Sequence, residues 1–401
     1  MRFAALALVV AACHHPAGHD VDGGVDFNAP DAAIDARNAC ENIANVLLAP
    51  RVDFATGTSP FGIAVADFNG DHLPDLAIAT QQPGGATVLL GMAPGCAAAF
   101  QPGVDFPTEG NVHAVAAADL DGDGRPDVAA VSQLLDVVSV LLDTTPAAGT
   151  TPTFAAPVDF ATATNPSAVA VGDVSGDGKP DLVTCAPDGI SVLVNTSAAG
   201  AASFAEKLDL PHTGATFGVA LADFNSDGKL DIAVTDSDAD TVSVYLNISA
   251  GALAFAAPMT FGTGGSPFAL AVADLDGDER PDIVVTDIAT DTISILANTT
   301  PIGAASASFS PHVDLPTGAR PYAVAIGDLN RDGHADIAVA AETPGAVSLH
   351  LASGTSYAPH LDVATLGAPH GVAIADLDGD TAPDLVVSSA DADMVSVLLA
   401  R

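Results

Sequence analysis

The chain has 401 residues and a formal net charge of −39 at pH 7, because 50 acidic side chains face only 11 Lys and Arg. Such an excess of negative charge makes nucleic acids and anionic membrane surfaces poor candidates as partners. Aromatic residues make up 5% of the chain, Trp is absent, 49% is apolar, and 37 Gly and 28 Pro are present, which favours many short strands joined by turns over helices.

The first twelve residues have the composition of an export signal. Arg2 is followed by an apolar run over residues 3–12 that is too short to span a bilayer, and Cys13 follows the run. The pattern resembles a bacterial lipoprotein signal, which implies that residues 1–12 are removed and that Cys13 carries lipid. The alternatives are an ordinary secretory signal with a chance cysteine and a chance apolar run at the N-terminus. We therefore expect an exported protein, either anchored by lipid on the outer membrane, at the cell surface or in the periplasm, or secreted, and touching a membrane only through the anchor.

Residues 13–44 are predicted to be a disordered tether. They consist mainly of Ala, Asp, Gly, Pro and His and show no sustained period of 2 or 3.6. Thirty such residues have a root-mean-square span of about 30 Å, enough to hold a lipid-anchored head clear of a membrane.

Three further cysteines remain. An export signal permits disulfides, so we predict a Cys40–Cys96 bond, since both residues flank the first repeat. Cys185 lies in an apolar strand with no histidine near it in sequence, which favours a buried thiol over a nucleophile.

A nine-residue acidic segment recurs seven times in residues 45–401, and we call each copy an aspartate loop. The copies start 48 to 54 residues apart and contain nearly half of the acidic residues. They are residues 67–75, 119–127, 173–181, 223–231, 274–282, 328–336 and 376–384. A period of this size predicts a repeat architecture.

Apolar strands surround each loop in a constant order. An apolar strand precedes each loop. Its residue three positions before the first aspartate is Ala in all seven copies, and the residues two and four positions before that aspartate are mostly larger aliphatic ones. This strand is therefore expected to be buried on both faces. A second, a third and a fourth strand follow each loop, with no helical segment between them. The sequence therefore predicts an all-β fold, a seven-bladed β-propeller of four-stranded antiparallel blades.

The two ends of the repeat array are complementary. A segment of the fourth-strand type, residues 48–54, precedes the first inner strand, and the chain ends just after a third strand, residues 395–399. We expect the N-terminal strand to complete the last blade and so close the ring without an unpaired edge.

Each aspartate loop offers oxygen donors at positions 1, 3, 5 and 9 and a backbone carbonyl at position 7, a donor set suited to calcium. We expect up to seven Ca²⁺ ions with structural roles; an aspartate-rich polar turn is the alternative. The expected ligands are Asp67, Asn69, Asp71, Leu73 and Asp75; Asp119, Asp121, Asp123, Arg125 and Asp127; Asp173, Ser175, Asp177, Lys179 and Asp181; Asp223, Asn225, Asp227, Lys229 and Asp231; Asp274, Asp276, Asp278, Arg280 and Asp282; Asp328, Asn330, Asp332, His334 and Asp336; and Asp376, Asp378, Asp380, Ala382 and Asp384.

The loop pattern D-x-[DN]-x-D-G-x-x-D between two apolar strands resembles the FG-GAP and VCBS repeats, as in the seven-bladed propeller of integrin α subunits. The resemblance covers about residues 48–401 and implies calcium in each loop, at the bottom of each blade. It says less about the ligand, because the fold hosts adhesion modules, lectins and some lyases.

The seven loops are not expected to bind equally. Position 6 is glycine in four loops but His72, Glu279 and Thr381 in the others, where a left-handed backbone would be strained. Position 3 of the third loop is Ser175, a weaker donor than a carboxylate. We expect the second loop to bind most tightly and the first, third and seventh less tightly.

The face opposite the loops is the predicted ligand face. The residue six before each loop forms a series rich in aromatic side chains: Phe61, His113, Ser167, Phe217, Phe268, Tyr322 and His370. These side chains either stack on a ligand at the channel mouth or wedge between blades, and the strand parity favours wedging. Nearby turns add Asp236, Asp238, Asp240, Asp287, Asp291, Asp391 and Asp393, read either as solvated turn acids or as a surface for a cationic or polyhydroxylated partner.

Three functions follow from this pattern. The first is a surface-anchored, monomeric binding or adhesion module for a protein or glycan on the face opposite the loops. The second is a carbohydrate-active enzyme such as a polysaccharide lyase, with Arg320 neutralising a carboxylate and Tyr322 or His370 handling the proton. The third is a calcium-binding scaffold with no ligand of its own.

Overall fold

The computed structural model describes residues 41–43, 46–82, 84–92, 99–212 and 214–400. The chain divides into two units, residues 1–38 and 39–401, and only the second contains described residues. The predicted export signal, residues 13–40 and 44 of the predicted tether, the lipidation site Cys13, and the Cys40–Cys96 bond lie outside these ranges. Residues 41–43, which were expected to belong to the disordered tether, instead form a strand that pairs with residues 46–48. Within the described residues there is no helix.

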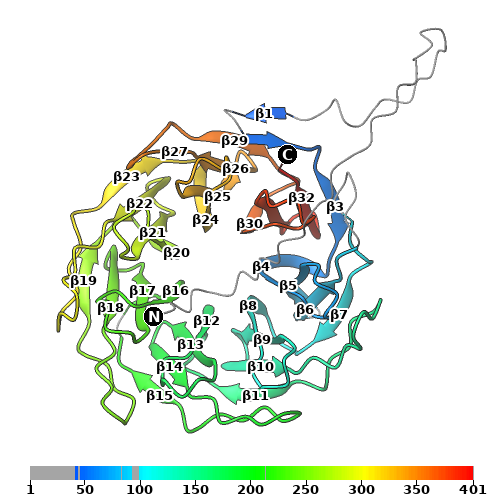
Figure 1. Ribbon diagram of the computed structural model, residues 1–401, viewed down its shortest axis with the longest axis horizontal. Coiled ribbons are helices and arrows are strands. Elements are labelled where there is room, and N and C mark those ends of the chain that lie inside the picture. Colours follow the sequence, from blue (N-terminus) through cyan, green and yellow to red (C-terminus); the bar gives the residue numbers. More distant parts are fainter. Residues whose placement is uncertain (1–40, 44–45, 83, 93–98, 213, 401) are drawn as a thin grey trace, which may run out of the picture. The chain divides into compact units, whose positions relative to one another are not determined.

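Seven four-stranded antiparallel sheets form the blades of a propeller (Figure 1), which confirms the predicted fold class. The innermost strands are β4 (Thr58–Ala66), β8 (Val112–Ala118), β12 (Ala168–Gly172), β16 (Val219–Ala222), β20 (Pro267–Ala273), β24 (Ala319–Gly327) and β30 (Pro369–Ala375). The second strands are β5 (Asp75–Gln82), β9 (Asp127–Ser132), β13 (Asp181–Ala186), β17 (Asp231–Asp236), β21 (Asp282–Asp287), β25 (Asp336–Thr343) and β31 (Asp384–Ser389). The third strands are β6 (Gly85–Leu89), β10 (Val137–Leu141), β14 (Gly189–Leu193), β18 (Thr241–Tyr245), β22 (Thr292–Leu296), β26 (Ala346–His350) and β32 (Met394–Leu398). The outer strands are β7 (Val104–Pro107), β11 (Val158–Ala161), β15 (Leu208–Leu210), β19 (Met259–Gly262), β23 (Val313–Pro316), β29 (Leu361–Ala364) and β3 (Val52–Ala55).

The last blade combines both ends of the repeat array, as the sequence predicts. β3 pairs antiparallel with β32, and the register places Phe54 opposite Val395. The order β3-β32-β31-β30 therefore completes a four-stranded sheet. Two short hairpins lie outside the blades, β1 (Glu41–Ile43) with β2 (Val46–Leu48), and β27 (Ala352–Ser353) with β28 (Ser356–Tyr357).

The core of the propeller is divided among the contacts between neighbouring blades. Among the residues that the structure describes, seven apolar clusters are present, and each joins the second and third strands of one blade to the next blade. The second strands β9, β13, β17, β21 and β31 are buried along their whole length because blades cover both of their faces. At the outer edge, edge-to-face ring pairs bridge adjacent blades: Phe54–Phe100, Phe106–Phe154, Phe160–Phe204 and Phe261–Phe309.

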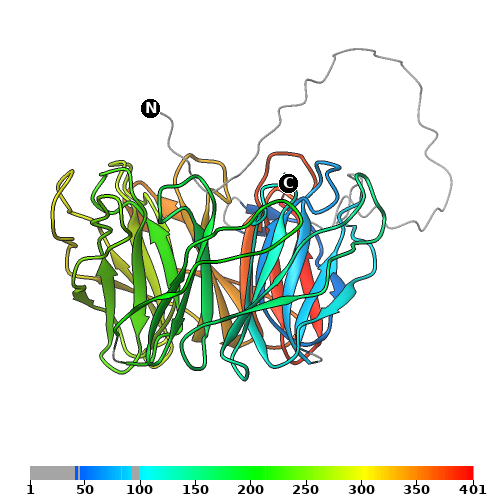
Figure 2. The ribbon, with the colours of Figure 1, turned by 90° about the horizontal axis from the view of Figure 1, so that it is seen from below.

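Alternating strand direction gives the ring two different faces. The aspartate loops, which join first to second strands, and the links from third to fourth strands emerge on one face, the loop face. The links from second to third strands and from each outer strand to the next blade emerge on the other, the hairpin face. Figure 2 shows the strands running between these two faces. No helix that could cross a membrane is found among the described residues.

Candidate functional site

Two backbone positions of every aspartate loop are left-handed. Position 6 has a positive φ in all seven loops, including His72 at 68°, Glu279 at 66° and Thr381 at 70°. This confirms the strain expected at these three residues, since side chains disfavour that conformation. Position 4 is also left-handed in all seven loops, and it is glycine except at Ser226 and Arg331. The sequence analysis missed position 4, although glycine at five of seven copies was a readable signal.

The first aspartate closes each loop by accepting backbone N–H groups. In the second loop, Oδ1 of Asp119 accepts N–H groups from Gly122 at 2.7 Å and Asp123 at 3.0 Å, and Oδ2 accepts that of Gly124 at 2.9 Å. The bonds from positions 5 and 6 recur in all seven loops. The turn is held further by Asp121, whose Oδ1 also accepts the N–H of Asp123, at 3.0 Å.

The ninth aspartate is a buried junction. It starts the second strand and is at most 1% exposed in every loop. In the fourth loop, Oδ2 of Asp231 accepts the N–H of Phe224 at 2.9 Å and Oδ1 accepts that of Asn247 at 2.7 Å. Equivalent bonds to the second residue after the third strand occur in all seven blades. The ninth aspartate thus joins the loop to the end of the third strand, a role that the sequence analysis did not assign.

Burial raises the pKa of these ninth-position carboxyls, although the two N–H bonds oppose the change. The pKa rises to about 7 for Asp75, Asp127, Asp231 and Asp384 and to about 6 for Asp282. For Asp181 and Asp336 it is also raised. Neighbouring loop aspartates raise the pKa of these carboxyls further, because like charges held close together disfavour ionisation.

The third position connects each of three loops to the next blade. Oδ2 of Asp121 accepts the N–H of Gly200 at 2.6 Å from the following blade. The amide of Asn69 donates to the carbonyl of Gly149 at 3.0 Å, and that of Asn225 donates to Ala304 at 3.0 Å. A ligand bound at these loops would therefore act on the contact between blades as well as on the loop.

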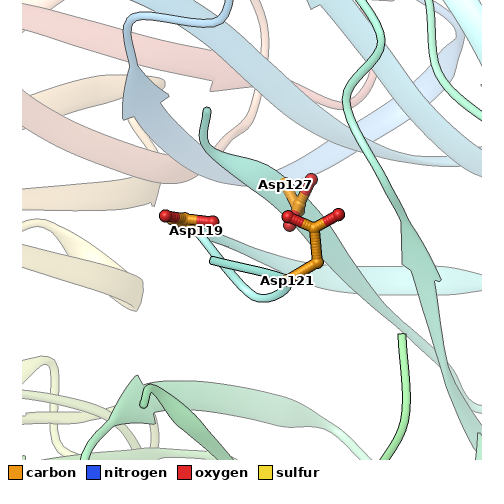
Figure 3. Close-up of side chains that lie close together, drawn as sticks. All are labelled: Asp119, Asp121 and Asp127. Carbon is orange, nitrogen blue, oxygen red and sulfur yellow. The ribbon is translucent and has the colours of Figure 1, made fainter. Parts of the chain in front are cut away.

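The carboxylates of three loops are close enough to share one cation. In each, the aspartates at positions 1, 3 and 9 bring one oxygen apiece to within 4.8 Å of the others: Asp119, Asp121 and Asp127; Asp274, Asp276 and Asp282; and Asp376, Asp378 and Asp384. Figure 3 shows the second loop, where the three side chains converge. An all-oxygen set of this kind fits Ca²⁺ better than a soft metal. The seventh loop joins the second and fifth, although the sequence analysis placed it lower. The calcium ligands remain predictions.

The predicted aromatic series forms a continuous arc on the innermost strands near the hairpin face, which we call the aromatic arc. Ring contacts run from Phe217 through Phe268, Tyr322, His370 and Phe61 to His113, with centroid distances of 4.4 to 5.3 Å. All six side chains are half-buried, and Ser167 interrupts the arc in the third blade. Rings therefore touch rings of adjacent blades and still leave surface open to solvent.

A β-bulge accounts for the placement of five of the six rings. The pairing of first and second strands shifts register around Phe61, His113, Phe268, Tyr322 and His370. A bulge adds one residue to one strand and re-aims its side chain. The parity argument, which grouped these residues with the blade-facing aliphatic ones, assumed an unbroken alternation and was incomplete.

The structure brings together the three residues named for the enzyme alternative. The guanidinium of Arg320 donates to the hydroxyl of Tyr322 at 2.5 Å, and the Tyr322 and His370 rings lie 4.5 Å apart. Arg320 also pairs with Glu342 at 2.8 Å. Burial lowers the pKa of His370. Its ring is thus largely neutral at pH 7, and Arg320 is already held by two partners.

The acidic turns of the hairpin face mostly have structural partners. Asp240, Asp291 and Asp393 have left-handed backbones, and the Oδ1 of each accepts an N–H from a residue at or just before the start of the next blade's innermost strand. Asp236 and Asp287 are buried, at 6% and 0% exposure. These five aspartates therefore have structural roles, and are not simply solvated turn acids or a charged surface for a ligand.

The one cysteine that can be placed behaves as predicted. Cys185 is free and fully buried, and burial raises the pKa of its thiol to about 12. A thiol with this pKa is a poor nucleophile at neutral pH.

Comparison with known proteins gives one family and several structures. The FG-GAP-like repeat family matches residues 67–130, 173–234, 223–285 and 328–387. No curated protein matches the chain.

Two crystal structures of BBS1N in complex with ARL6DN, one soaked with mercury and one with lead, have a similar fold. Their sequences are 11% and 13% identical to this chain, and their TM-scores are 0.59 and 0.57. Each match covers 87% of this chain, and the matches cover 95% and 96% of the respective BBS1N chains.

A third structure with a related fold is a lectin. The Agrocybe aegerita lectin that recognises non-reducing terminal N-acetylglucosamine is 17% identical, with a TM-score of 0.51, and the match covers 77% of this chain and 80% of the lectin. At these identities the likeness concerns the fold alone.

Proposed function

Because the chain belongs to the FG-GAP-like repeat family, we propose that it is a calcium-stabilised propeller that binds a protein or glycan ligand on its hairpin face. The observation that carries this proposal is the aromatic arc. Six half-buried rings, one from each of six blades, form a series of contacts on the face away from the aspartate loops. Half-buried rings of this kind stack on sugar rings and on peptide side chains at little entropic cost.

Calcium would be held by the aspartate loops and would supply positive charge to them. Asp119, Asp121 and Asp127 fit it, because their oxygens converge and the pKa of Asp127 is raised by burial before any cation is present. The residues of the loop close the turn and orient the carboxylates. The ion would then tie the start of the second strand to the loop and, through the third position, to the next blade.

The ligand-binding proposal predicts that Phe268→Ala weakens ligand binding about ten- to thirtyfold, because one stacking contact is lost. Phe268 contacts Phe217 at 4.8 Å and Tyr322 at 5.3 Å, so it lies inside the arc. The measurement is a glycan array, including glycans that end in N-acetylglucosamine, together with a peptide library, probed with the full chain in calcium.

Phe261→Ala is the matched control for that test. Phe261 is also a half-buried phenylalanine, but it lies on the outer strand β19 and packs against Phe309. Its loss should lower stability without changing ligand affinity. Equal affinity of Phe268→Ala and the wild type for a bound ligand would remove the arc from the binding site.

A lyase acting on acidic polysaccharides is the second candidate, and the contacts among Arg320, Tyr322 and His370 favour it. Incubating the same glycans and polyuronates with the protein tests it by the appearance of unsaturated products. Turnover that disappears in Tyr322→Phe supports the enzyme, whereas binding without turnover supports the binding module.

We further propose that the protein is exported and held to a membrane by lipid on Cys13. The apolar run at residues 3–12 followed by cysteine supports this proposal. Cys13→Ala should move the protein from the membrane fraction to the soluble fraction of the expressing cells. Wild-type protein found only in the soluble fraction would contradict the anchor.

A further inference from the structure

Two carboxyls in the fifth blade contact one hydroxyl group. The Oγ of Ser294 lies 2.8 Å from Oδ2 of Asp287, at the end of β21, and 2.9 Å from Oδ1 of Asp314 on β23. The same oxygen accepts the N–H of Gly264 at 2.8 Å. A hydroxyl has one hydrogen, so Ser294 can donate to only one of the two carboxyls. The other short contact requires a proton on a carboxyl, because a hydrogen bond needs a hydrogen between the two oxygens.

Asp287 is the member of this pair that suits the neutral form. It is 0% exposed, and its Oδ1 has no hydrogen-bond partner among the described residues. The side chain of Asp314 is 43% exposed, and its Oδ1 also lies 2.7 Å from Nδ1 of His312. Solvent and His312 therefore stabilise the charge on Asp314, whereas burial opposes it on Asp287. Burial raises the pKa of Asp287 to about 7, and Asp314 and His312 are the charged groups that change this pKa most.

The sixth blade has the same arrangement without the second carboxyl. Ser348 donates to Asp362 at 2.7 Å, and Nδ1 of His360 lies 3.0 Å from that aspartate. Ala341 stands in β25 where β21 has Asp287. Among the described residues, six blades pair a Ser or Thr hydroxyl with an outer-strand aspartate, and only in the fifth does this hydroxyl contact a second carboxyl. The hydroxyl–aspartate pair is thus general, and the second carboxyl is specific to one blade.

The second carboxyl also contacts the segment that enters the fifth blade, residues 263–266, which we call the entry segment. A Cβ placed on Gly264 would lie 2.7 Å from the carboxyl carbon of Asp287, so the backbone packs directly on this carboxyl. Asp287 pairs with Pro267 at the start of β20, next to the bulge at Phe268. A buried carboxylate with an unpaired oxygen is costly unless water reaches it. Ionisation of Asp287 therefore favours opening of the entry segment.

The other charged groups around the entry segment have partners of their own. The entry segment, β20 and β22 contain no titratable side chain. Asp240 of the preceding blade accepts the N–H of Ser266 at 2.7 Å, and Asp291, in the turn after β21, accepts that of Arg320 at 2.9 Å. The guanidinium of Arg320 is held by two groups of the sixth blade. The charge state of Asp287 therefore depends chiefly on the outer-strand groups described above.

We propose that Asp287 and Asp314 share one proton through Ser294, and that loss of this proton to solvent at alkaline pH opens the entry segment. With the proton present, Asp287 donates to Ser294, Ser294 donates to Asp314, and the two carboxyls together carry one negative charge. Without it, two carboxylates compete for one hydroxyl hydrogen and repel each other. The fifth blade thus contains a pH-dependent device that loosens the start of the strand that carries Phe268. This device is independent of calcium and of any ligand.

The test is amide hydrogen exchange of the full chain in saturating calcium at about pH 6 and about pH 8, corrected for the intrinsic exchange rate at each pH. The N–H groups of Gly264, Gly265 and Ser266 all have acceptors, so their exchange reports opening of the entry segment. In the wild type, the opening constant should rise about tenfold, since a group with a pKa of about 7 passes from about one tenth to about nine tenths ionised. Asp287→Asn keeps an N–H donor for Ser294 and cannot ionise, so its corrected exchange should be equal at both pH values.

Two further variants make the result specific. Asp362→Asn removes the matching outer-strand aspartate from the sixth blade, which has no second carboxyl, so the entry segment should keep the wild-type pH dependence. Asp314→Asn leaves Asp287 as the one carboxyl at Ser294 and supplies an N–H in place of the other. Ser294 can then donate to an ionised Asp287, so the pH dependence should shrink.

Each outcome decides for or against the shared proton. Wild-type exchange that is equal at both pH values after correction would overturn the proposal. A tenfold rise that persists in Asp287→Asn would assign the titration to another group and would overturn it as well. A rise unchanged in Asp314→Asn, or abolished by Asp362→Asn, would show that the two carboxyls of the fifth blade do not share the proton.

Discussion

Replacing Asp231 by alanine should lower the free energy of unfolding of the calcium-free protein by about 4 kcal/mol at about pH 6. The carboxyl is fully buried and accepts the N–H groups of Phe224 and Asn247. Each buried N–H left without an acceptor costs about 1–3 kcal/mol, and alanine leaves two. At this pH the raised pKa of Asp231, about 7, keeps the carboxyl mostly protonated, so its charge contributes little to the comparison.

The loss extends beyond one blade because Asn247 is itself a link. Its side-chain amide donates to the carbonyl of Val174 in the preceding blade at 2.8 Å and to that of Leu230 at 3.1 Å. Without the carboxyl of Asp231, the segment that carries Asn247 loses one of its anchors. Both the fourth loop and its contact with the third blade should therefore loosen.

Urea unfolding followed by circular dichroism, in buffer with a chelator, checks this expectation. Asp227→Ala is the matched control in the same loop, since its side chain is 23% exposed and pairs with Lys229 at the surface. We expect it to cost less than about 1 kcal/mol. Asp231→Asn should fall between the two, because it keeps one acceptor. Equal losses for Asp227→Ala and Asp231→Ala would show that the ninth position has no special structural role.

The fold could be predicted from the sequence because the loop and strand motifs that define each blade are short and recur along the chain. A loop that recurs every 48 to 54 residues gives the blade count, and the surplus outer strand at residues 48–54 gives the closure. The pairing of β3 with β32 follows from these two observations, whereas its register, with Val52 opposite Val397, comes from the structure. The number of blades and the closure of the ring can both be predicted without knowing how the side chains pack.

The aromatic arc was harder to predict, because the alternation of side chains along a strand does not reveal where a β-bulge occurs. Phe268 is at the position expected for the arc, but the register shift between Pro267 and Leu270 interrupts the regular alternation of side chains along the strand. Period-2 reasoning holds only where the ladder is regular. The contact between Phe268 and Tyr322 needs the positions of two blades, which sequence spacing does not contain.

The double role of the ninth aspartate was hidden for a different reason. A carboxylate that binds a cation and one that accepts buried N–H groups look identical in sequence. Oδ1 of Asp127 accepts the N–H of Asp143 at 2.7 Å, and Asp143 follows the neighbouring strand β10, 16 residues further along the chain. Composition pointed to charge at these positions, whereas the structure shows that they also hold the blade together.

The unfolding free energy of the calcium-free protein should fall as the pH rises from about 4 to about 7. Burial raises the pKa of Asp75, Asp127, Asp231 and Asp384 to about 7, against 3.8 for the ordinary side chain. Above about pH 4 the unfolded chain releases these protons while the folded protein still holds them, so rising pH favours unfolding. The decline ends once the folded carboxyls are also ionised, near pH 7.

Calcium should remove this dependence, because it binds the ionised carboxylates and offsets the charge that burial opposes. The thermal stabilisation by calcium is therefore expected to be small at about pH 5 and large at about pH 8, since protons compete with the ion at the lower pH. A tenfold change in the acid dissociation constant of one carboxyl on folding corresponds to about 1.4 kcal/mol, so several sites together should change stability by several kcal/mol.

Melting curves at both pH values, in chelator and in calcium, measure the two effects in one experiment. Magnesium at equal concentration is the control, and it should stabilise less because its octahedral shell suits these loops poorly. Identical melting in chelator and calcium at about pH 8 would contradict calcium binding by the loops. A calcium effect that is equal at both pH values would instead show that the buried ninth-position aspartates keep ordinary pKa values and are ionised throughout, with their N–H bonds offsetting the cost of burial.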